Sequence, residues 1–269
     1  MTSNVVQIDP WKNASLASYK RPVATTIASS ILRHAPTGCH PVLVTTQNPG
    51  ELYWVKPQNN PHGQTSLLAE RIVAAVGKYL GAPIPRTELI EIPDVFSSYA
   101  LPNGDVLSTG LAHGSLHVER ECVEDTELLH IPRDGNRFRA PKFIALWEWC
   151  FGEDPQWLYA AADDYQLWTF DHGLWIGGGG EWSISDLSAT SHLSSGWAGS
   201  VRGMDQGTFL GLADAIESCS VSDLLSFVSA VPIDWGFGDA ELIEVAKWLD
   251  QRRPSVITSL KQHARNAVA

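Results

Sequence analysis

The residues best equipped for chemistry lie in the stretch Leu167–Glu181, where four strand-forming residues lead into Asp171, His172 and Gly173. A carboxylate at the exit of a strand is a hard oxygen ligand of the kind that magnesium binds in proteins. The glycine after it gives the following backbone freedom to turn. An isolated Asp-x-Gly turn is too common to identify a metal site, so Asp171 gains weight only from its position behind an apolar strand and after the elements described next. We expect a flexible loop at Gly177–Gly180, with a plain glycine-rich connector as the alternative.

A lysine and a glutamate earlier in the chain could supply the charged partners of such a site. Lys56 ends the strand-like sequence LYWVK, where a lysine that points into solvent is the ordinary alternative. Glu70 falls in a helical pattern, and the residues three, four and seven positions later are Val73, Ala74 and Gly77. Because a carboxylate among small and apolar neighbours needs a cationic partner, we predict an ion pair between Lys56 and Glu70. A half-exposed helix carboxylate is the alternative for Glu70.

The elements that must position these residues follow from hydropathy and turn signals. The sequence QNPG is a good turn between two short strands, and Gly81 with Pro83 is a common stop for the helix before them. Residues 96–136 are rich in loops, and the final third is mainly helical. The predicted elements are strands at 40–46, 51–56 and 85–93, helices at 64–80 and 141–150, and a hairpin at 156–170.

Length and composition limit the classes of protein that fit. The 269 residues are 44% hydrophobic, which is enough for a large core. We divide the chain into a polar arm (1–27), an N-lobe with the first sheet and helix (28–95) and a C-lobe (96–269). The net charge of −11 argues against nucleic acid or an anionic membrane as an obligate partner. Four dispersed cysteines, no signal peptide and no membrane-length apolar run predict a cytoplasmic protein.

Two residue types invite a functional interpretation that we do not adopt. The nine histidines show no HxxxH or HxH spacing with a third partner, so we expect surface or loop histidines instead of a metal site. Four of the eleven tryptophans lie in segments that we expect to be buried: Trp147, Trp149, Trp157 and Trp168. Their predicted role is core packing.

The order of these features is typical of protein-kinase-like folds, in which a strand lysine and a helix glutamate precede a hairpin that exits into Asp-x-Gly. The block Leu52–Ile92, LYWVKPQNNPHGQTSLLAERIVAAVGKYLGAPIPRTELIEI, resembles the HipA-like kinase family, in its compact branch without a large N-terminal extension. Its Val-Lys at a strand end, its Ala-Glu in a helix and its LGxPxP exit are typical of that group. Gly110–His117 resembles the family's Gly-Ser turn between the lobes, and WTFDHG its metal-binding turn. The resemblance spans residues 28–185.

The resemblance implies an α+β, protein-kinase-like two-lobed fold, with a small β-rich N-lobe containing one helix and a larger, mainly helical C-lobe. It implies ATP and Mg²⁺ binding and phosphoryl transfer to a Ser or Thr hydroxyl of a protein. The acceptor, whether a protein or a small molecule, is unknown. Lys56 would hold the phosphates, Glu70 would orient Lys56, and Asp171 would coordinate magnesium. Gly38 lies where a loop would cover the phosphates, although no Gly-rich loop is recognisable there.

The catalytic loop departs from the family's pattern. The family has an Asp that positions the attacking hydroxyl and, a few residues later, an Asn that binds a second metal ion. In the corresponding stretch, CFGEDPQWLY, Asp154 could be the catalytic Asp and Gln156 could replace the Asn, but their spacing is shorter. Glutamine can offer a side-chain carbonyl oxygen to a metal ion, as asparagine does, but its side chain is longer and approaches at a different angle. Two functions stay open: an active HipA-like serine/threonine kinase, or a pseudokinase-type module that binds a nucleotide or a partner.

Overall fold

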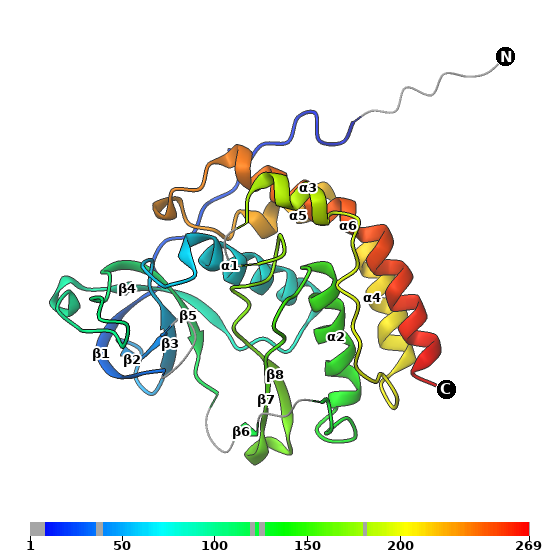
Figure 1. Cartoon of the computed structure of the whole chain (residues 1–269), viewed down its shortest axis with the longest axis horizontal. Helices are drawn as coiled ribbons and strands as arrows, with labels where there is room; N and C mark the ends of the chain where they lie inside the picture. Colours follow the sequence, from blue (N-terminus) through cyan, green and yellow to red (C-terminus); the bar gives the residue numbers. More distant parts are fainter. Residues whose placement is uncertain (1–8, 36–39, 119–121, 124–126, 180–181, 269) are drawn as a thin grey trace.

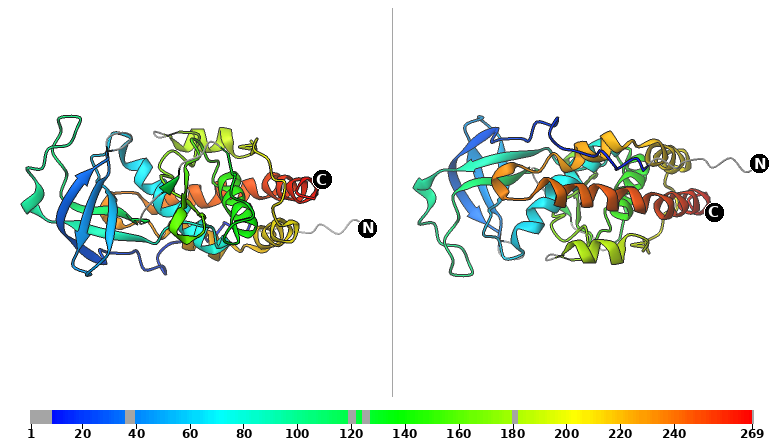
Figure 2. Two further views of the ribbon diagram at one scale, coloured as in Figure 1. Left: turned by 90° about the horizontal axis from the view of Figure 1, so that it is seen from below. Right: turned by 90° about the horizontal axis from the view of Figure 1, so that it is seen from above.

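The computed structural model describes residues 9–35, 40–118, 122–123, 127–179 and 182–268. A closed five-stranded barrel lies at one end of an elongated molecule, and the C-terminal end of the last helix lies at the other (Figures 1 and 2). A small three-stranded sheet with the order β6-β7-β8 lies beside the helices. The described strands are β1 (Thr26–His34), β2 (Val42–Thr46), β3 (Leu52–Lys56), β4 (Thr87–Ile92), β5 (Gly110–Leu116), β6 (Cys122–Val123), β7 (Trp157–Ala160) and β8 (Gln166–Thr169). The described α-helices are α1 (Gly63–Leu80), α2 (Asn136–Trp149), α3 (Ile184–Thr190), α4 (Gln206–Ser218), α5 (Val221–Val228) and α6 (Asp239–Asn266).

The barrel is built on the predicted hairpin of β2 and β3, in which Val42 pairs with Val55. Its strand order is β1-β2-β3-β5-β4, so β5 lies between β3 and β4. The pairing of β1 with β4 closes the barrel. Gly114 of β5 must be a glycine, because an added Cβ would lie 2.3 Å from the Ile90 side chain. The sequence GLAHGSLH is therefore a barrel strand, and our expectation that it forms a turn between lobes is wrong. The run alternates too weakly in polarity to be recognised as a strand.

Helix α1 confirms the predicted helix and its stop signal. Gly81 ends it in the left-handed conformation, with φ 63°, and its N–H bonds back to the carbonyls of Gly77 and Lys78. Leu67, Ile72 and seven further residues of the helix are buried together with Glu70. Each fully buried leucine or isoleucine contributes roughly 1.5–3 kcal/mol relative to exposure, so the packing of this face fixes the rotation of the helix. Glu70 is thereby held in the interior.

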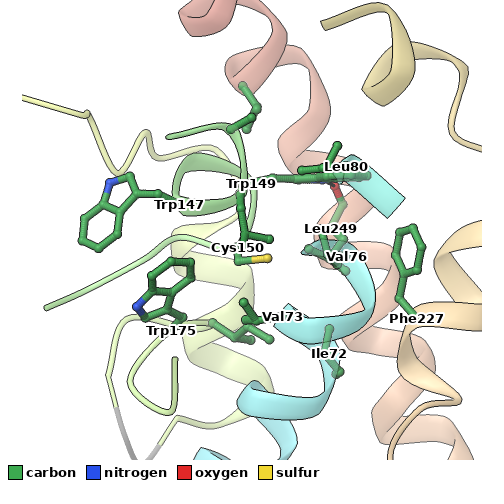
Figure 3. Close-up of a cluster of buried hydrophobic side chains, with 14 of the residues drawn as sticks. Ile72, Val73, Val76, Leu80, Trp147, Trp149, Cys150, Trp175, Phe227 and Leu249 are labelled. Carbon is green, nitrogen blue, oxygen red and sulfur yellow. Dashed lines mark hydrogen bonds between the residues drawn. The ribbon is translucent and has the colours of Figure 1, made fainter. Parts of the chain in front are cut away.

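The helical part of the chain packs around α2 and α6. Trp149 and Leu249 lie in one cluster with Phe227 and residues of α1 (Figure 3). The Trp149 indole donates to the carbonyl of Leu249, which joins α2 to α6. Among the described helices, none is long and apolar enough to cross a membrane.

The hairpin that leads to Asp171 is pinned to α2 by one buried asparagine. Strands β7 and β8 confirm the predicted hairpin, with a 3-10 turn at Ala161–Asp163 between them. The Asn136 amide donates to the carbonyls of His130 and Tyr165, and its carbonyl accepts the Leu167 N–H. Because the Asn136 side chain is fully buried and needs these partners, it both caps the turn and fixes the hairpin.

A buried arginine ties the ends of two helices together. Arg252 of α6 is 0% exposed and donates to the carbonyls of Glu148 and Trp149 at the C-terminus of α2 and of Thr190 at the C-terminus of α3. Burial lowers the pKa of Arg252 to about 10, so the guanidinium stays charged at neutral pH. A cation beside helix C-termini satisfies otherwise unpaired carbonyls and the helix dipoles.

Replacing Arg252→Met is expected to lower the free energy of unfolding by at least about 3 kcal/mol, because several buried carbonyls lose their donors. Urea unfolding followed by circular dichroism measures the difference. The exposed Arg265 of the same helix provides the matched control, since Arg265→Met should change stability by no more than about 0.5 kcal/mol. Equal effects of the two substitutions would contradict this account of Arg252.

Candidate functional site

The candidate site centres on the ammonium of Lys56, which is 5% exposed at the end of β3. Its Nζ donates to Oε1 of Glu70 at 2.6 Å and to Oδ1 of Asp171 at 2.8 Å. The structure therefore brings together three residues predicted from sequence, from a strand, a helix and the turn after a hairpin. The predicted Lys56–Glu70 ion pair is confirmed.

Two histidines that the sequence analysis did not assign to the site surround the Glu70 carboxylate. Nε2 of His113 lies 3.9 Å from Glu70 Oε2, and Nδ1 of His172 lies 3.7 Å from the same oxygen. Burial alone would raise the pKa of Glu70, but the charge of Lys56 and the two imidazoles hold that pKa well below its usual range. Glu70 is therefore a carboxylate, and it keeps the buried lysine charged.

The two histidines differ in their surroundings. Burial lowers the pKa of His113 to about 3, so this imidazole is neutral at physiological pH. His113 pairs directly with Lys56 across β3 and β5, and that register is the signal that would have identified it. Nε2 of His172 hydrogen-bonds to Oγ1 of Thr169 at 3.1 Å. His172 thus joins the end of β8 to the Glu70 carboxylate.

The turn at Asp171 is a close fit to Lys56. Asp171 adopts a left-handed backbone, with φ 55°, which an aspartate tolerates better than most residues. At Gly173 an added Cβ would lie 2.9 Å from the Lys56 Nζ and 3.2 Å from the Ser66 Cβ. The glycine is therefore required for close approach, a role that differs from the backbone freedom that we expected of it.

The proposed catalytic loop leads into β7, the first strand of the β7–β8 hairpin. Gln156 accepts the N–H of Phe170 at 3.3 Å and the hydroxyl of Thr169 at 2.9 Å through its backbone carbonyl. Its side chain donates to Oδ2 of the exposed Asp154 at 3.1 Å. The structure therefore places Asp154 and Gln156 together, with Gln156 bonded to the end of β8, two residues before Asp171. Gly38, the remaining predicted site residue, lies outside the described residues.

The donor set is compatible with a magnesium ion that shares its ligands with a phosphate. Among the described residues, no group of three or more His, Cys, Asp or Glu side chains is arranged to hold a metal ion by itself. Magnesium is commonly held by one or two carboxylates, with water and phosphate oxygens completing its shell. The Asp171 side chain is 29% exposed, so a hard oxygen ligand is accessible at the site. The residues present therefore fit magnesium brought in with a nucleotide and do not form an all-protein metal cage.

His113 makes the stability of the fold pH-dependent. Its unfolded pKa is about 6.5, so below that pH the unfolded chain binds a proton that the folded chain refuses until about pH 3. Stability should fall by roughly 1.4 kcal/mol per pH unit from this group as the pH drops from 6.5 to 4.5. His113→Leu is expected to flatten that slope in urea unfolding, whereas the exposed control His192→Leu should keep it. A slope unchanged in His113→Leu would contradict the buried neutral imidazole.

Comparison with known proteins places this geometry in context. Residues 28–137 match the family model described as HipA-like kinase. This span contains Lys56, Glu70 and His113, and it ends before the Asp154 loop and Asp171. A search of curated proteins finds no significant match.

A solved structure extends the likeness in fold over most of the chain. The crystal structure of the Helicobacter pylori proinflammatory kinase CtkA superposes with a TM-score of 0.58 and 14% sequence identity, and the match covers 90% of this chain and 97% of that chain. At this identity the likeness concerns the fold alone. The sequence match is to a family of kinases, and the structural likeness supports the mixed α+β fold. The chain thus resembles the HipA-like kinase family in sequence over residues 28–137, as the Lys56 and Glu70 motifs predict.

Proposed function

We propose that this protein is an ATP- and Mg²⁺-dependent phosphotransferase that acts on a Ser or Thr hydroxyl of a protein acceptor. The observation that carries the proposal is the convergence of Glu70 and Asp171 on the Lys56 ammonium, at 2.6 and 2.8 Å. An ammonium held between two carboxylates at the exit of a hairpin can exchange one of them for phosphate oxygens. Phosphoryl transfer needs such positioning and charge neutralisation more than covalent chemistry.

In this proposal Lys56 and Glu70 form the nucleotide side of the site. Lys56 would bind phosphate oxygens, and Glu70 would keep the ammonium charged and fixed in direction while Asp171 turns to the metal ion. Magnesium, when bound, would neutralise phosphate charge, with Asp171 as its carboxylate ligand and Gln156 offering a carbonyl oxygen. Gly38 would belong to the segment over the phosphates.

Asp154 forms the acceptor side of the site. Its carboxylate would accept the proton of the attacking hydroxyl as the oxygen–phosphorus bond forms and the bond between the γ-phosphoryl group and ADP breaks. Asp154 is exposed and lies in the loop that leads into β7, which pairs with β8, the strand before Asp171. That placement leaves room for an acceptor to approach from solvent.

The division into lobes is part of the proposal. The arm would be residues 1–27, and the C-lobe would carry the hairpin and the helices. Strand β5 belongs to the barrel because it pairs with β3 and β4. The N-lobe would accordingly extend from residue 28 through β5, beyond the boundary at residue 95 expected from sequence.

A pseudokinase-type binding module is the second candidate, and the Asp154 loop favours it. The Asp154 and Gln156 side chains hydrogen-bond to each other. This hydrogen bond restrains the orientation of both side chains, although Oδ1 of Asp154 and the side-chain carbonyl oxygen of Gln156 take no part in it. A chain with this loop could bind a nucleotide without transferring its phosphoryl group.

Nucleotide binding is tested by thermal unfolding with and without Mg·ATP. At 100 times its Kd, ATP should stabilise the wild type by about 2.7 kcal/mol, a rise in Tm of several degrees. Lys56→Met and Asp171→Asn should abolish the rise, because phosphate and metal lose their protein ligands. Lys78→Met, at an exposed position of α1, is the matched control and should keep the rise. No rise for the wild type would refute the kinase and the nucleotide-binding form of the pseudokinase.

Transfer of radiolabelled phosphate from ATP to protein separates the two candidates. For an active kinase, Asp154→Asn should lower the rate by a factor of about 10² or more while the ATP-dependent rise in Tm persists. Asp163→Asn, at the exposed turn of the same hairpin, should leave the rate unchanged. Transfer that survives in Asp154→Asn would show that another carboxylate is catalytic. A rise in Tm without transfer in the wild type would favour the pseudokinase.

A further inference from the structure

A hollow of about 410 Å³ lies next to the Asp154 loop, and three tryptophans line it. Trp147 lies in the last turn of α2, Trp157 begins β7, and Trp197 lies between α3 and α4. Glu127 and Pro155 also line this hollow. We call it the tryptophan pocket. Because Pro155 follows Asp154 directly, the pocket lies on the side of the loop where the proposed acceptor would approach.

The three rings form a box of carbon surfaces. The Trp147 and Trp197 rings have centroids 6.2 Å apart and planes at 80°, and the Trp157 and Trp197 rings have centroids 6.1 Å apart and planes at 59°. The indole nitrogens of all three are buried and have no hydrogen-bond partner among the described residues. The indole nitrogens are therefore closed to an occupant, and an occupant that stacks on a ring face would meet its negative π-surface.

The predicted core-packing role is confirmed for Trp147, Trp149 and Trp157, which are buried members of the main core cluster, whereas Trp168 is half-buried. Figure 3 shows the Trp147 ring pointing away from the side of α2 on which Trp149 packs against Leu80 and Leu249. Trp147 and Trp157 are each 8% exposed. A small part of each ring thus remains available to an occupant.

The charge around the tryptophan pocket has one sign. Glu127 is the charged member of its described lining, and the exposed carboxylate of Asp154 precedes Pro155. No lysine or arginine is found among the described lining residues. Carboxylates next to aromatic faces favour a cation over a neutral apolar group, and the net charge of −11 acts in the same direction.

We propose that the tryptophan pocket binds a cationic nitrogen group of the phosphoacceptor. The volume is near the lower end of the range for ligand pockets, about 300–1,000 Å³, so it suits one ammonium or guanidinium group with its alkyl stem. The cation could be the side chain of a basic residue near the target hydroxyl of a protein, or the head of a free amino alcohol. The role in acceptor binding rests on the proposed function, but cation binding itself does not require a nucleotide.

Isothermal titration without nucleotide tests the pocket with two pairs of probes. The first pair is a short serine peptide containing arginine and the same peptide with citrulline, which is neutral and nearly isosteric. The second pair is choline and 3,3-dimethylbutanol. In each pair that binds, the cation should bind about fivefold or more tightly than its neutral partner.

Two variants locate the binding. Trp197→Leu should weaken binding of the cation about fivefold, whereas Trp168→Leu, on β8 outside the pocket, should not. Glu127→Gln changes an exposed side chain and leaves the fold intact, and it should weaken binding and reduce its dependence on salt. Glu217→Gln, an exposed glutamate of α4, is its matched control.

Each result has a stated meaning. Binding of the peptide alone, or of choline alone, supports the proposal and identifies the source of the cation. Equal affinity for charged and neutral partners, or no binding of either cation, overturns it. Wild-type affinity in both Trp197→Leu and Glu127→Gln also overturns it, because the cation would then bind elsewhere. If the protein binds the cation but its Tm does not rise with Mg·ATP, the proposed function is refuted, whereas cation binding by the tryptophan pocket is still supported.

Discussion

A buried ammonium is the constraint on which this structure depends. Moving a lysine charge out of water costs several kcal/mol unless carboxylates compensate it, and Lys56 is 5% exposed. Glu70 and Asp171 provide that compensation from two other elements. The barrel, α1 and the β7–β8 hairpin must therefore keep their mutual positions for the charge to remain paired. A site made in this way is preorganised, because the same contacts that satisfy the lysine also aim it.

Buried contacts outside the Lys56 cluster hold its carboxylates and the β7–β8 hairpin in place. Packing of α1 holds Glu70 inside, and His172 joins its carboxylate to Thr169 at the end of β8. Asn136 fixes the hairpin to α2, and Arg252 holds the C-termini of α2 and α3. These are buried polar groups with specific partners, so they favour one geometry over other compact arrangements. The sheet and the helices are thereby connected through few, well-defined contacts.

The sequence predicted those parts of the fold and site that depend on local signals. The β2–β3 hairpin, α1 with its Gly81 stop and the β7–β8 hairpin each have turn or cap residues at the correct positions. The Lys56–Glu70 pair could be predicted because a carboxylate on a packed helix face requires a cation. His113 could not, since its role depends on the register of β5 with β3, and β5 itself lacks a clear alternation. The close approach at Gly173 and the box of Trp147, Trp157 and Trp197 arise only when distant segments meet.

The central claim is that the Lys56 cluster holds the phosphates and the metal ion of a nucleotide. A crystal structure with Mn²⁺ and a non-hydrolysable ATP analogue tests this most directly, because manganese can be located by its anomalous scattering. The account predicts a manganese peak bound to the Asp171 carboxylate and a phosphate oxygen within hydrogen-bonding distance of the Lys56 Nζ, with the Lys56–Glu70 pair retained. A nucleotide bound elsewhere, or manganese away from Asp171, would contradict it.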